Sequence, residues 1–261
     1  MRDPHVTRVH FTVGSDKHIS YRNPPPLSFT HSVGTFNLVN DHLEVEPSQH
    51  FASKEQALAI IEPCLRAWEI NRDLIGNWGE IRFTFDHAEM EDRNPPPPGP
   101  GRIMGCEAGS YALAFSDVHS EVVKTKYSAP PENFDWSTEL DITYQRWKDY
   151  LEGKEPLLSM ANFIISYMTN IPGGEKAARD RYCIYRNVLK KIRRLCAYKG
   201  TPATARKAPP NNVFVDLTDE EREWLIKAIP AVIHRIGEHA AGADVKMLSM
   251  SDLPTLTRRR S

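Results

Sequence analysis

The sequence has few cysteines and no long hydrophobic run. Its four cysteines, Cys64, Cys106, Cys183 and Cys196, are scattered over 261 residues and include no C-x-x-C pair, so a disulfide framework is not expected. The N-terminus lacks the apolar segment of a secretory signal. The most apolar stretch, "LLSMANFIISYM", is shorter than the roughly 20 residues that span a bilayer. These absences predict a cytoplasmic protein with reduced thiols and no membrane partner.

The motifs of common catalytic and cofactor sites are also missing. No P-loop, G-x-G-x-x-G or H-E-x-x-H pattern is present, and no Cys and His cluster has zinc spacing. The nearest stretch to a G-x-S-x-G nucleophile elbow, "EAGSYA", has the wrong spacing. The sequence therefore predicts no cofactor and favours a non-catalytic protein over an enzyme.

The composition is that of a globular protein, with 40% hydrophobic, 26% charged and 9% aromatic residues. Its net charge of −1 hides an uneven distribution. Residues 1–175 carry 15 Lys and Arg against 25 Asp and Glu, residues 176–207 carry 11 against 1, and residues 208–261 carry 7 against 8. Such an asymmetry bears on binding partners rather than on the fold.

The first half of the chain shows the alternation of β-strands. In "VTRVHFTV", Val9, Phe11 and Val13 fall on one face, with polar residues between them. The stretches "FNLVNDHLEVE" and "EIRFTFDHAEMED" predict two further strands. Another pair is expected over residues 110–117 and 118–127. The sequence therefore predicts an antiparallel sheet in this half.

A helix is expected after Ser53, because Ser53 and Gln56 form the pattern of a capping box. Pro63 lies inside its apolar spacing, so a kink or a break is expected there. Further along, Thr218 and Glu221 form a second capping box ahead of another helix.

From residue 136 onward the apolar spacing becomes helical. The predicted fold class is therefore α+β. An antiparallel β-rich domain with one or two helices is expected over residues 1–135, followed by a mainly α-helical domain over residues 136–261. The tail after residue 242 is expected to fray.

The basic segment predicts one amphipathic helix over residues 176–200. Within it, "RYCIYRNVLKKIRRLCAYKG" contains seven Lys and Arg and no acid. The apolar stripe expected to dock this helix consists of Tyr182, Tyr185, Leu189, Ile192 and Cys196. The candidate residues for contact with an anionic partner are Arg179, Arg186, Lys190, Lys191, Arg193 and Arg194.

Three interpretations of this cationic surface are open. It lies against the acidic N-terminal half or in water, it binds the phosphates of a nucleic acid, or it binds an acidic protein. The acidic half of a second copy of the chain is one such protein, which would mean self-association. A pI near 6.8 argues against a dedicated nucleic-acid binder, whereas the basic segment argues for one. The sequence predicts a binding or regulatory protein.

A weaker candidate is a metal site in "DHLEVEPSQH". A strand there would place His42, Glu44 and Glu46 on one face, with Leu43 and Val45 on the other. Imidazole and carboxylate groups are ligands for zinc and iron. The solvent face of an antiparallel strand also favours such residues, so both interpretations are open.

A ribonuclease is the alternative function. The stretch "RIGEH" places Arg235 and His239 with three residues between them, and Arg186 is followed by Asn187. A β-rich half followed by helices that carry an Arg, a short spacer and a His resembles HEPN ribonucleases. The resemblance implies metal-independent RNA cleavage, with His239 as acid or base and Arg235 stabilising the phosphate. The spacer is one residue shorter than the family's usual minimum, and no His follows Asn187.

Overall fold

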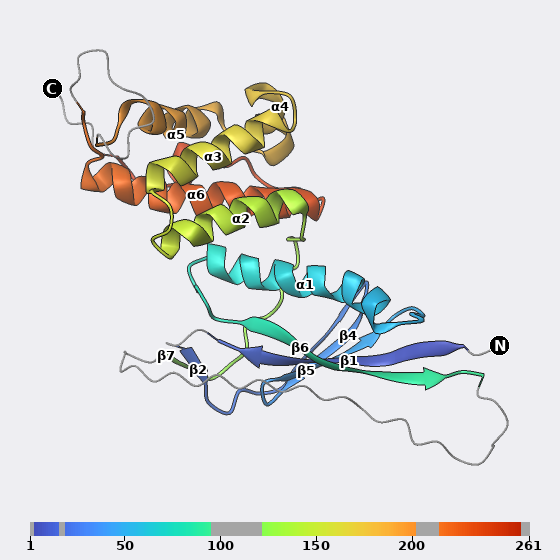
Figure 1. The fold of residues 1–261 in the computed structure, drawn as a ribbon. Helices are drawn as coiled ribbons and strands as arrows, with labels where there is room; N and C mark the ends of the chain where they lie inside the picture. Colours follow the sequence, from blue (N-terminus) through green and yellow to red (C-terminus); the bar gives the residue numbers. More distant parts are fainter. Residues whose placement is uncertain (1–2, 16–18, 95–121, 202–213, 257–261) are drawn as a thin grey trace. The chain divides into compact units, whose positions relative to one another are not determined.

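The computed structural model describes residues 3–15, 19–94, 122–201 and 214–256. The chain forms two compact units, unit 1 up to Pro130 and unit 2 from Pro131 (Figure 1). Unit 1 contains an antiparallel five-stranded sheet with one α-helix, and the described part of unit 2 contains five α-helices. The predicted α+β class and its order along the chain are confirmed.

The boundary between the units falls before residue 135 because Phe134 and Asp135 pack on helix α6 (Asp219–Ala240). The ring of Phe134 occupies the space of a side chain at Gly237, where a Cβ would lie 2.2 Å from Cε2 of the ring. The amide of Asp135 donates to the carbonyl of Gly237 at 3.0 Å. A glycine inside a helix is ordinarily unfavourable, and here it makes room for an aromatic ring.

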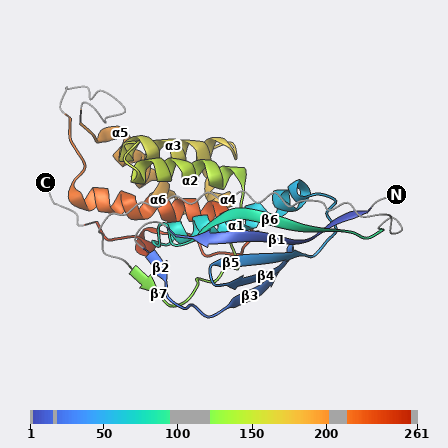
Figure 2. The same ribbon diagram turned by 60° about the horizontal axis from the view of Figure 1, so that its bottom comes forward.

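The sheet of unit 1 has the strand order β3-β4-β5-β1-β6 and is antiparallel throughout (Figure 2). Its strands are β1 (Pro4–Gly14), β3 (Leu27–His31), β4 (Gly34–Val39), β5 (His42–Pro47) and β6 (Arg82–Asp92). A separate small sheet pairs β2 (Ile19–Tyr21) in parallel with β7 (Val122–Lys124). The expected strand over residues 110–117 and Cys106 lie outside the described residues.

The stretch expected as one strand, "FNLVNDHLEVE", is a hairpin of β4 and β5. Its two-residue turn consists of Asn40 and Asp41, with φ angles of 50° and 60°. Positive φ at both positions is the type I′ geometry that matches the twist of a hairpin and favours Asn and Asp. Tyr127 supports the turn, since its hydroxyl donates to the Asp41 carboxylate at 2.8 Å and accepts from the Asp41 amide at 2.7 Å. The buried positions change phase across the turn, from Phe36 and Leu38 on β4 to Leu43 and Val45 on β5.

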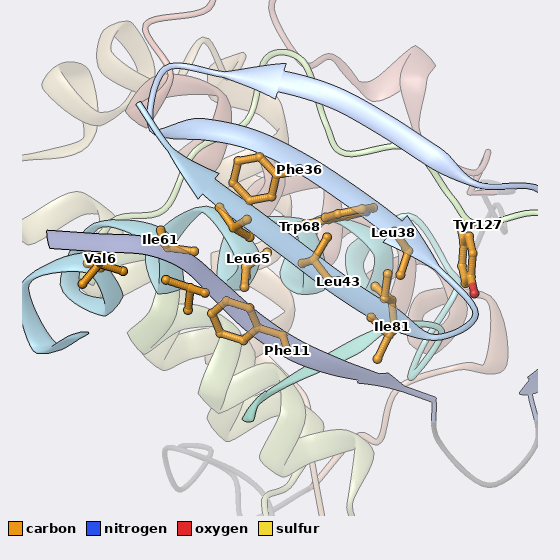
Figure 3. Packing of buried hydrophobic residues seen from close by; sticks show 14 of the residues in the cluster. Val6, Phe11, Phe36, Leu38, Leu43, Ile61, Leu65, Trp68, Ile81 and Tyr127 are labelled. Atoms are coloured by element: carbon orange, nitrogen blue, oxygen red, sulfur yellow. The ribbon is translucent and has the colours of Figure 1, made fainter. Parts of the chain in front are cut away.

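Helix α1 (Lys54–Leu74) covers one face of the sheet and closes the core of unit 1 (Figure 3). A kink or a break was expected at Pro63. The helix continues through this residue without a break. Ile61 and Leu65, on either side of the proline, are buried in the core, and this burial offsets the lost backbone hydrogen bond. The core side chains around α1 include Val6, Val9, Phe11, Phe36, Leu38, Leu43, Val45, Trp68 and Ile81.

The start of α1 differs from the expected capping box in one contact. The hydroxyl of Ser53 accepts from the amide of Gln56 at 3.4 Å, as the pattern predicts. The side chain of Gln56 accepts from the amide of Ala52 at 3.0 Å instead of that of Ser53. The helix end is therefore capped from both sides, by a variant of the motif.

A buried charge network links the end of α1 to β7. The side chain of Glu80 is fully buried, and its Oε2 accepts from Nη2 of Arg72 at 2.8 Å. Its Oε1 lies 2.8 Å from Nζ of Lys124 and accepts a hydrogen bond from Ser128. Burial by itself raises the pKa of Glu80, but the hydrogen bonds from Lys124, Ser128 and Arg72 outweigh it, so the pKa lies below the ordinary 4.5.

Unit 2 is a bundle of helices around an apolar centre. Its helices are α2 (Thr138–Leu151), α3 (Leu157–Asn170), α4 (Glu175–Tyr182), α5 (Arg186–Tyr198) and α6 (Asp219–Ala240). The central element is α3, which is apolar on nearly all sides and packs against each of the other four. The capping box of Thr218 and Glu221 opens α6 as predicted. Within the described residues, no helix is both long and apolar enough to cross a membrane.

The C-terminal tail packs on unit 2 through residue 253, which corrects the expectation that it frays after residue 242. Leu248 and Leu253 are buried. Leu248 forms a parallel bridge with Ile184, and its carbonyl accepts from the amide of Tyr185 at 2.9 Å. A short 3-10 turn, Met250–Asp252, follows. Burial of these two leucines docks an otherwise mostly polar segment on unit 2.

Candidate anion-binding surface

The basic segment forms two helices, α4 and α5, instead of the single helix expected over residues 176–200. The chain reverses at Cys183, which has a left-handed φ of 50° and whose amide donates to the carbonyl of Arg179. The following residue, Ile184, is fully buried and bridges Leu248. The extended pairing with the tail, a contact between distant parts of the sequence, therefore interrupts the helix.

Helix α5 is docked on one side, as its apolar spacing predicts. Four members of the expected stripe, Tyr182 at the end of α4 and Leu189, Ile192 and Cys196 on α5, are at most 2% exposed. The fifth, Tyr185, is 51% exposed because it precedes the first turn of α5. The remaining sides of the helix carry the cations.

Several of the candidate cations are neutralised by acids of unit 2. Nη1 of Arg193 lies 2.5 Å from Oε2 of Glu175, and its Nη2 donates to the hydroxyl of Thr169 at 2.9 Å. Lys191 lies 3.8 Å from the carboxylate of Glu221. These two cations therefore form contacts within the helical bundle.

Glu221 is itself held in its charged form by the basic segment. Nζ of Lys199 lies 3.0 Å from Oε2 of Glu221. Burial raises the pKa of Glu221. The hydrogen bonds from Lys199 and from the Thr218 amide, together with the charges of Lys199 and Lys191, lower this pKa by more than burial raises it. The net pKa lies below its ordinary value, which stabilises the junction of α5 and α6 near neutral pH.

The side chain of Arg179 is partly buried. Its Nε is buried and has no hydrogen-bond partner among the described residues. This cation is on α4, on the other side of the reversal from Lys190 and Arg194. It therefore cannot belong to the row of cations along α5.

The cations that face solvent form one row on α5. Arg186, Lys190 and Arg194 are exposed and follow one another at four-residue spacing, and Tyr198, at 78% exposed, continues the row. Neither Lys190 nor Arg194 forms an ion pair within the described part of the chain, and Arg186 makes a 3.5 Å contact with Glu175 while its side chain stays 59% exposed. We call these four residues the α5 row.

Sequence reasoning missed Tyr198, although a signal for it was present. Tyr198 lies four residues after Arg194, so the two side chains are neighbours on the surface of the helix. Only its exposure in the structure separates it from Tyr182, whose hydroxyl donates to Glu139 at 2.8 Å within the bundle.

The two residues of the ribonuclease alternative have different partners. Nη1 of Arg235 donates to Oε2 of Glu238 at 2.8 Å. His239 is exposed, and its Nε2 accepts from Nε of Arg181 at 3.0 Å. Arg181 is held in place by Glu139, whose Oε1 lies 2.9 Å from its Nη2. The structure thus places a different arginine, Arg181, beside His239.

The residues of the candidate metal site lie on β5, with side chains on one face as predicted. Leu43 and Val45 are fully buried between them. Nε2 of His42 lies 2.9 Å from Nδ1 of His10. Oε1 of Glu44 lies 3.4 Å from Nε of Arg8, and Glu46 is exposed. The three side chains therefore have different neighbours: His42 contacts His10, Glu44 contacts Arg8, and Glu46 is exposed.

Comparison with known proteins yields no relative. No family model, curated protein or solved structure matches this chain.

Proposed function

We propose that this protein is a non-catalytic nucleic-acid-binding protein of the cytoplasm, with the α5 row as its contact surface. The observation that carries the proposal is an uninterrupted row of three solvent-facing cations that ends in an exposed tyrosine. Cations contact phosphates, and an exposed aromatic ring stacks on an unpaired base. The combination favours a single strand over a duplex, since the bases of a duplex are already stacked.

The dimensions of the row suit a short stretch of nucleic acid. Successive members are about 6 Å apart along the helix axis at 1.5 Å per residue, so the row spans about 18 Å from Arg186 to Tyr198. Three phosphate contacts are a modest number, and they predict weak, salt-sensitive binding. A regulatory or accessory role fits such an affinity better than stable storage of nucleic acid.

The charges of the two units support the choice of unit 2 as the binding part. Residues 131–261 carry 21 Lys and Arg against 17 Asp and Glu, whereas residues 1–130 carry 12 against 17. Unit 2 therefore has a net charge of +4 and unit 1 of −5. A polyanion would be attracted to unit 2 and repelled by unit 1.

The test is fluorescence anisotropy of single-stranded RNA and DNA over a series of salt concentrations. With three phosphate contacts, the logarithm of the association constant should fall with the logarithm of salt with a slope of about −2. The variant Lys190→Glu with Arg194→Glu should bind weakly and show a slope shallower by about 1.4. These two cations are chosen because they form no ion pair within the described residues.

A matched control changes the same amount of charge elsewhere in unit 2. Arg222→Glu with Lys227→Glu reverses two exposed cations of α6 and should leave binding nearly intact. Equal losses in both double variants would mean that net charge, not the α5 row, decides binding. If wild type does not bind at low salt, the proposal fails, and an acidic protein or a second copy of the chain becomes the partner to test by sedimentation.

The ribonuclease alternative has one observation in its favour, the exposed pair of His239 and Arg181 at 3.0 Å. A neutral imidazole that accepts from an arginine has the components for moving a proton beside a phosphate. Incubation of RNA with the protein in EDTA distinguishes the two functions. Intact RNA after incubation in EDTA supports binding alone, whereas cleavage in EDTA that is lost in His239→Ala supports the ribonuclease.

A further inference from the structure

His10 is a buried histidine on the face of the sheet that points away from α1. It lies between Val9 and Phe11 of β1, which both belong to the core under α1, and side chains alternate between the faces of a strand. The residue is nevertheless only 6% exposed. A buried imidazole on the polar face of a sheet needs an explanation.

The two ring nitrogens of His10 have different surroundings. Nδ1 lies 2.9 Å from Nε2 of His42, within hydrogen-bond distance. Nε2 is buried and has no hydrogen-bond partner among the described residues. It does lie 3.4 Å from Oε1 of Glu89, but without the geometry of a hydrogen bond. A buried polar atom without a partner costs free energy, so Nε2 is suited to a ligand that the protein itself does not provide.

Two further side chains of ligand type lie close to His10 on the neighbouring strand β6. His87 is the cross-strand partner of His10, with ring centroids 4.2 Å apart and nearly parallel planes. Glu89 follows two residues later on the same face. One ligand atom from each of His10, His87 and Glu89 lies within 4.8 Å of the others. Two imidazoles and a carboxylate are thus grouped on one face of the sheet.

The spacing is close to that of a metal centre. In a tetrahedral zinc site with bonds of about 2.0–2.1 Å, neighbouring ligand atoms are about 3.3 Å apart. Nε2 of His10 and Oε1 of Glu89 are 3.4 Å apart. The side chains of His87 and Glu89 are 51% and 45% exposed, which leaves room for a rotamer change that closes the remaining distance, while His10 is buried. Glu89 also lies 3.8 Å from Nη1 of Arg8, a contact that a bound metal ion would replace.

Each histidine is oriented by a partner on its other nitrogen. Nδ1 of His87 lies 3.0 Å from Oδ2 of Asp86, as Nδ1 of His10 lies beside His42. Both rings therefore have Nε2 available. A hydrogen bond on the second nitrogen is the usual arrangement for a metal-bound histidine. The register shift between His10 and Phe11 leaves Asp86 opposite no residue of β1, and such bulges redirect side chains.

We propose that His10, His87 and Glu89 bind a divalent transition-metal ion of the zinc type. Three protein ligands leave the fourth tetrahedral position open to water or another ligand. The site differs from the one suggested by the sequence, because His42 orients His10 and neither Glu44 nor Glu46 belongs to it. It lies in unit 1 and does not depend on the proposed nucleic-acid surface in unit 2.

The test is titration of untagged, chelator-treated full-length protein with Zn²⁺ by calorimetry, and with Co²⁺ by absorption spectroscopy. Wild type should bind one ion per chain, and Zn²⁺ should raise its melting temperature. His87→Asn and Glu89→Gln should each abolish the saturable site, and circular dichroism should show both variants folded, since these side chains are half exposed. His42→Asn should weaken binding by about 10–100-fold, as expected of an orienting residue.

The matched control is His50→Asn. This exposed histidine contacts another, His5, at 3.0 Å outside the proposed site, so it measures adventitious binding to a histidine pair. Retained binding in the control and loss in His87→Asn and Glu89→Gln support the proposal. The absence of saturable binding in wild type overturns it, as does binding that persists in both ligand variants or is lost equally in His50→Asn.

Discussion

Arg193 of α5 and Glu175 of α4 form the tightest ion pair of the basic segment, with 2.5 Å between Nη1 and Oε2. Two nearby cations of α5 have no such partner in the part of the chain that the structure describes. Arg194 is exposed and forms no ion pair within the described residues, and Lys190 is the same. A segment that is uniformly basic in sequence is therefore divided in the structure into cations that stabilise the bundle and cations that face solvent.

This division predicts that substitutions at two adjacent residues affect different properties of the protein. Arg193→Glu should destabilise unit 2 by about 1 kcal/mol, since it removes a partly exposed ion pair and places two carboxylates together. Arg194→Glu should leave stability nearly unchanged but weaken nucleic-acid binding. Urea denaturation followed by circular dichroism, beside the anisotropy assay, measures both. Equal destabilisation by the two changes would contradict the assignment.

Tyr198→Ala should weaken binding of single strands without affecting the fold. Stacking of a base on an aromatic ring contributes about 1–3 kcal/mol, whereas a side chain that is 78% exposed contributes little to the core. The loss should be absent with duplex DNA, whose bases are not available for stacking. Tyr198→Phe is the matched control and should retain the affinity, because stacking needs the ring and not the hydroxyl.

Glu80→Gln should strongly destabilise unit 1, by about 3–5 kcal/mol. The change keeps the shape of the side chain but leaves Arg72 and Lys124 without their shared counter-charge in a site where Glu80 is fully buried. Hydrogen exchange of the α1 and β6 amides, measured by mass spectrometry, reports this unit specifically. Glu91→Gln changes an exposed carboxylate of β6 and should have almost no effect. Comparable losses in the two variants would disprove a special role for the buried network.

The contribution of Glu80 should also depend on pH. Its pKa in the folded protein lies below 4.5, because the hydrogen bonds from Lys124, Ser128 and Arg72 outweigh the effect of burial. A carboxylate with a lowered pKa stabilises the fold above the ordinary value and loses that contribution as the pH falls through its folded value. The stability difference between wild type and Glu80→Gln should therefore be largest near pH 7 and shrink below pH 4.5. A constant difference across this range would show that the carboxylate does not titrate as described.

Local patterns in the sequence were sufficient for the fold class. The alternation of Val9, Phe11 and Val13 predicts a half-buried strand, and the spacing of the apolar residues after residue 136 predicts helices. Burial of an apolar face is required wherever such an element forms, so the pattern determines the element with little help from its neighbours. The capping box at Thr218 was equally readable, because it involves residues three apart.

Only the tertiary structure decided which polar residues have partners. Glu175 and Glu221 approach the basic helix from other elements, so no local pattern separates Arg193 from Arg194. The sequence by itself determined that the segment is basic and amphipathic. The reversal at Cys183 and the meeting of His10 with His87 depend on pairing between distant strands and segments, because long-range register is set by how the whole core packs.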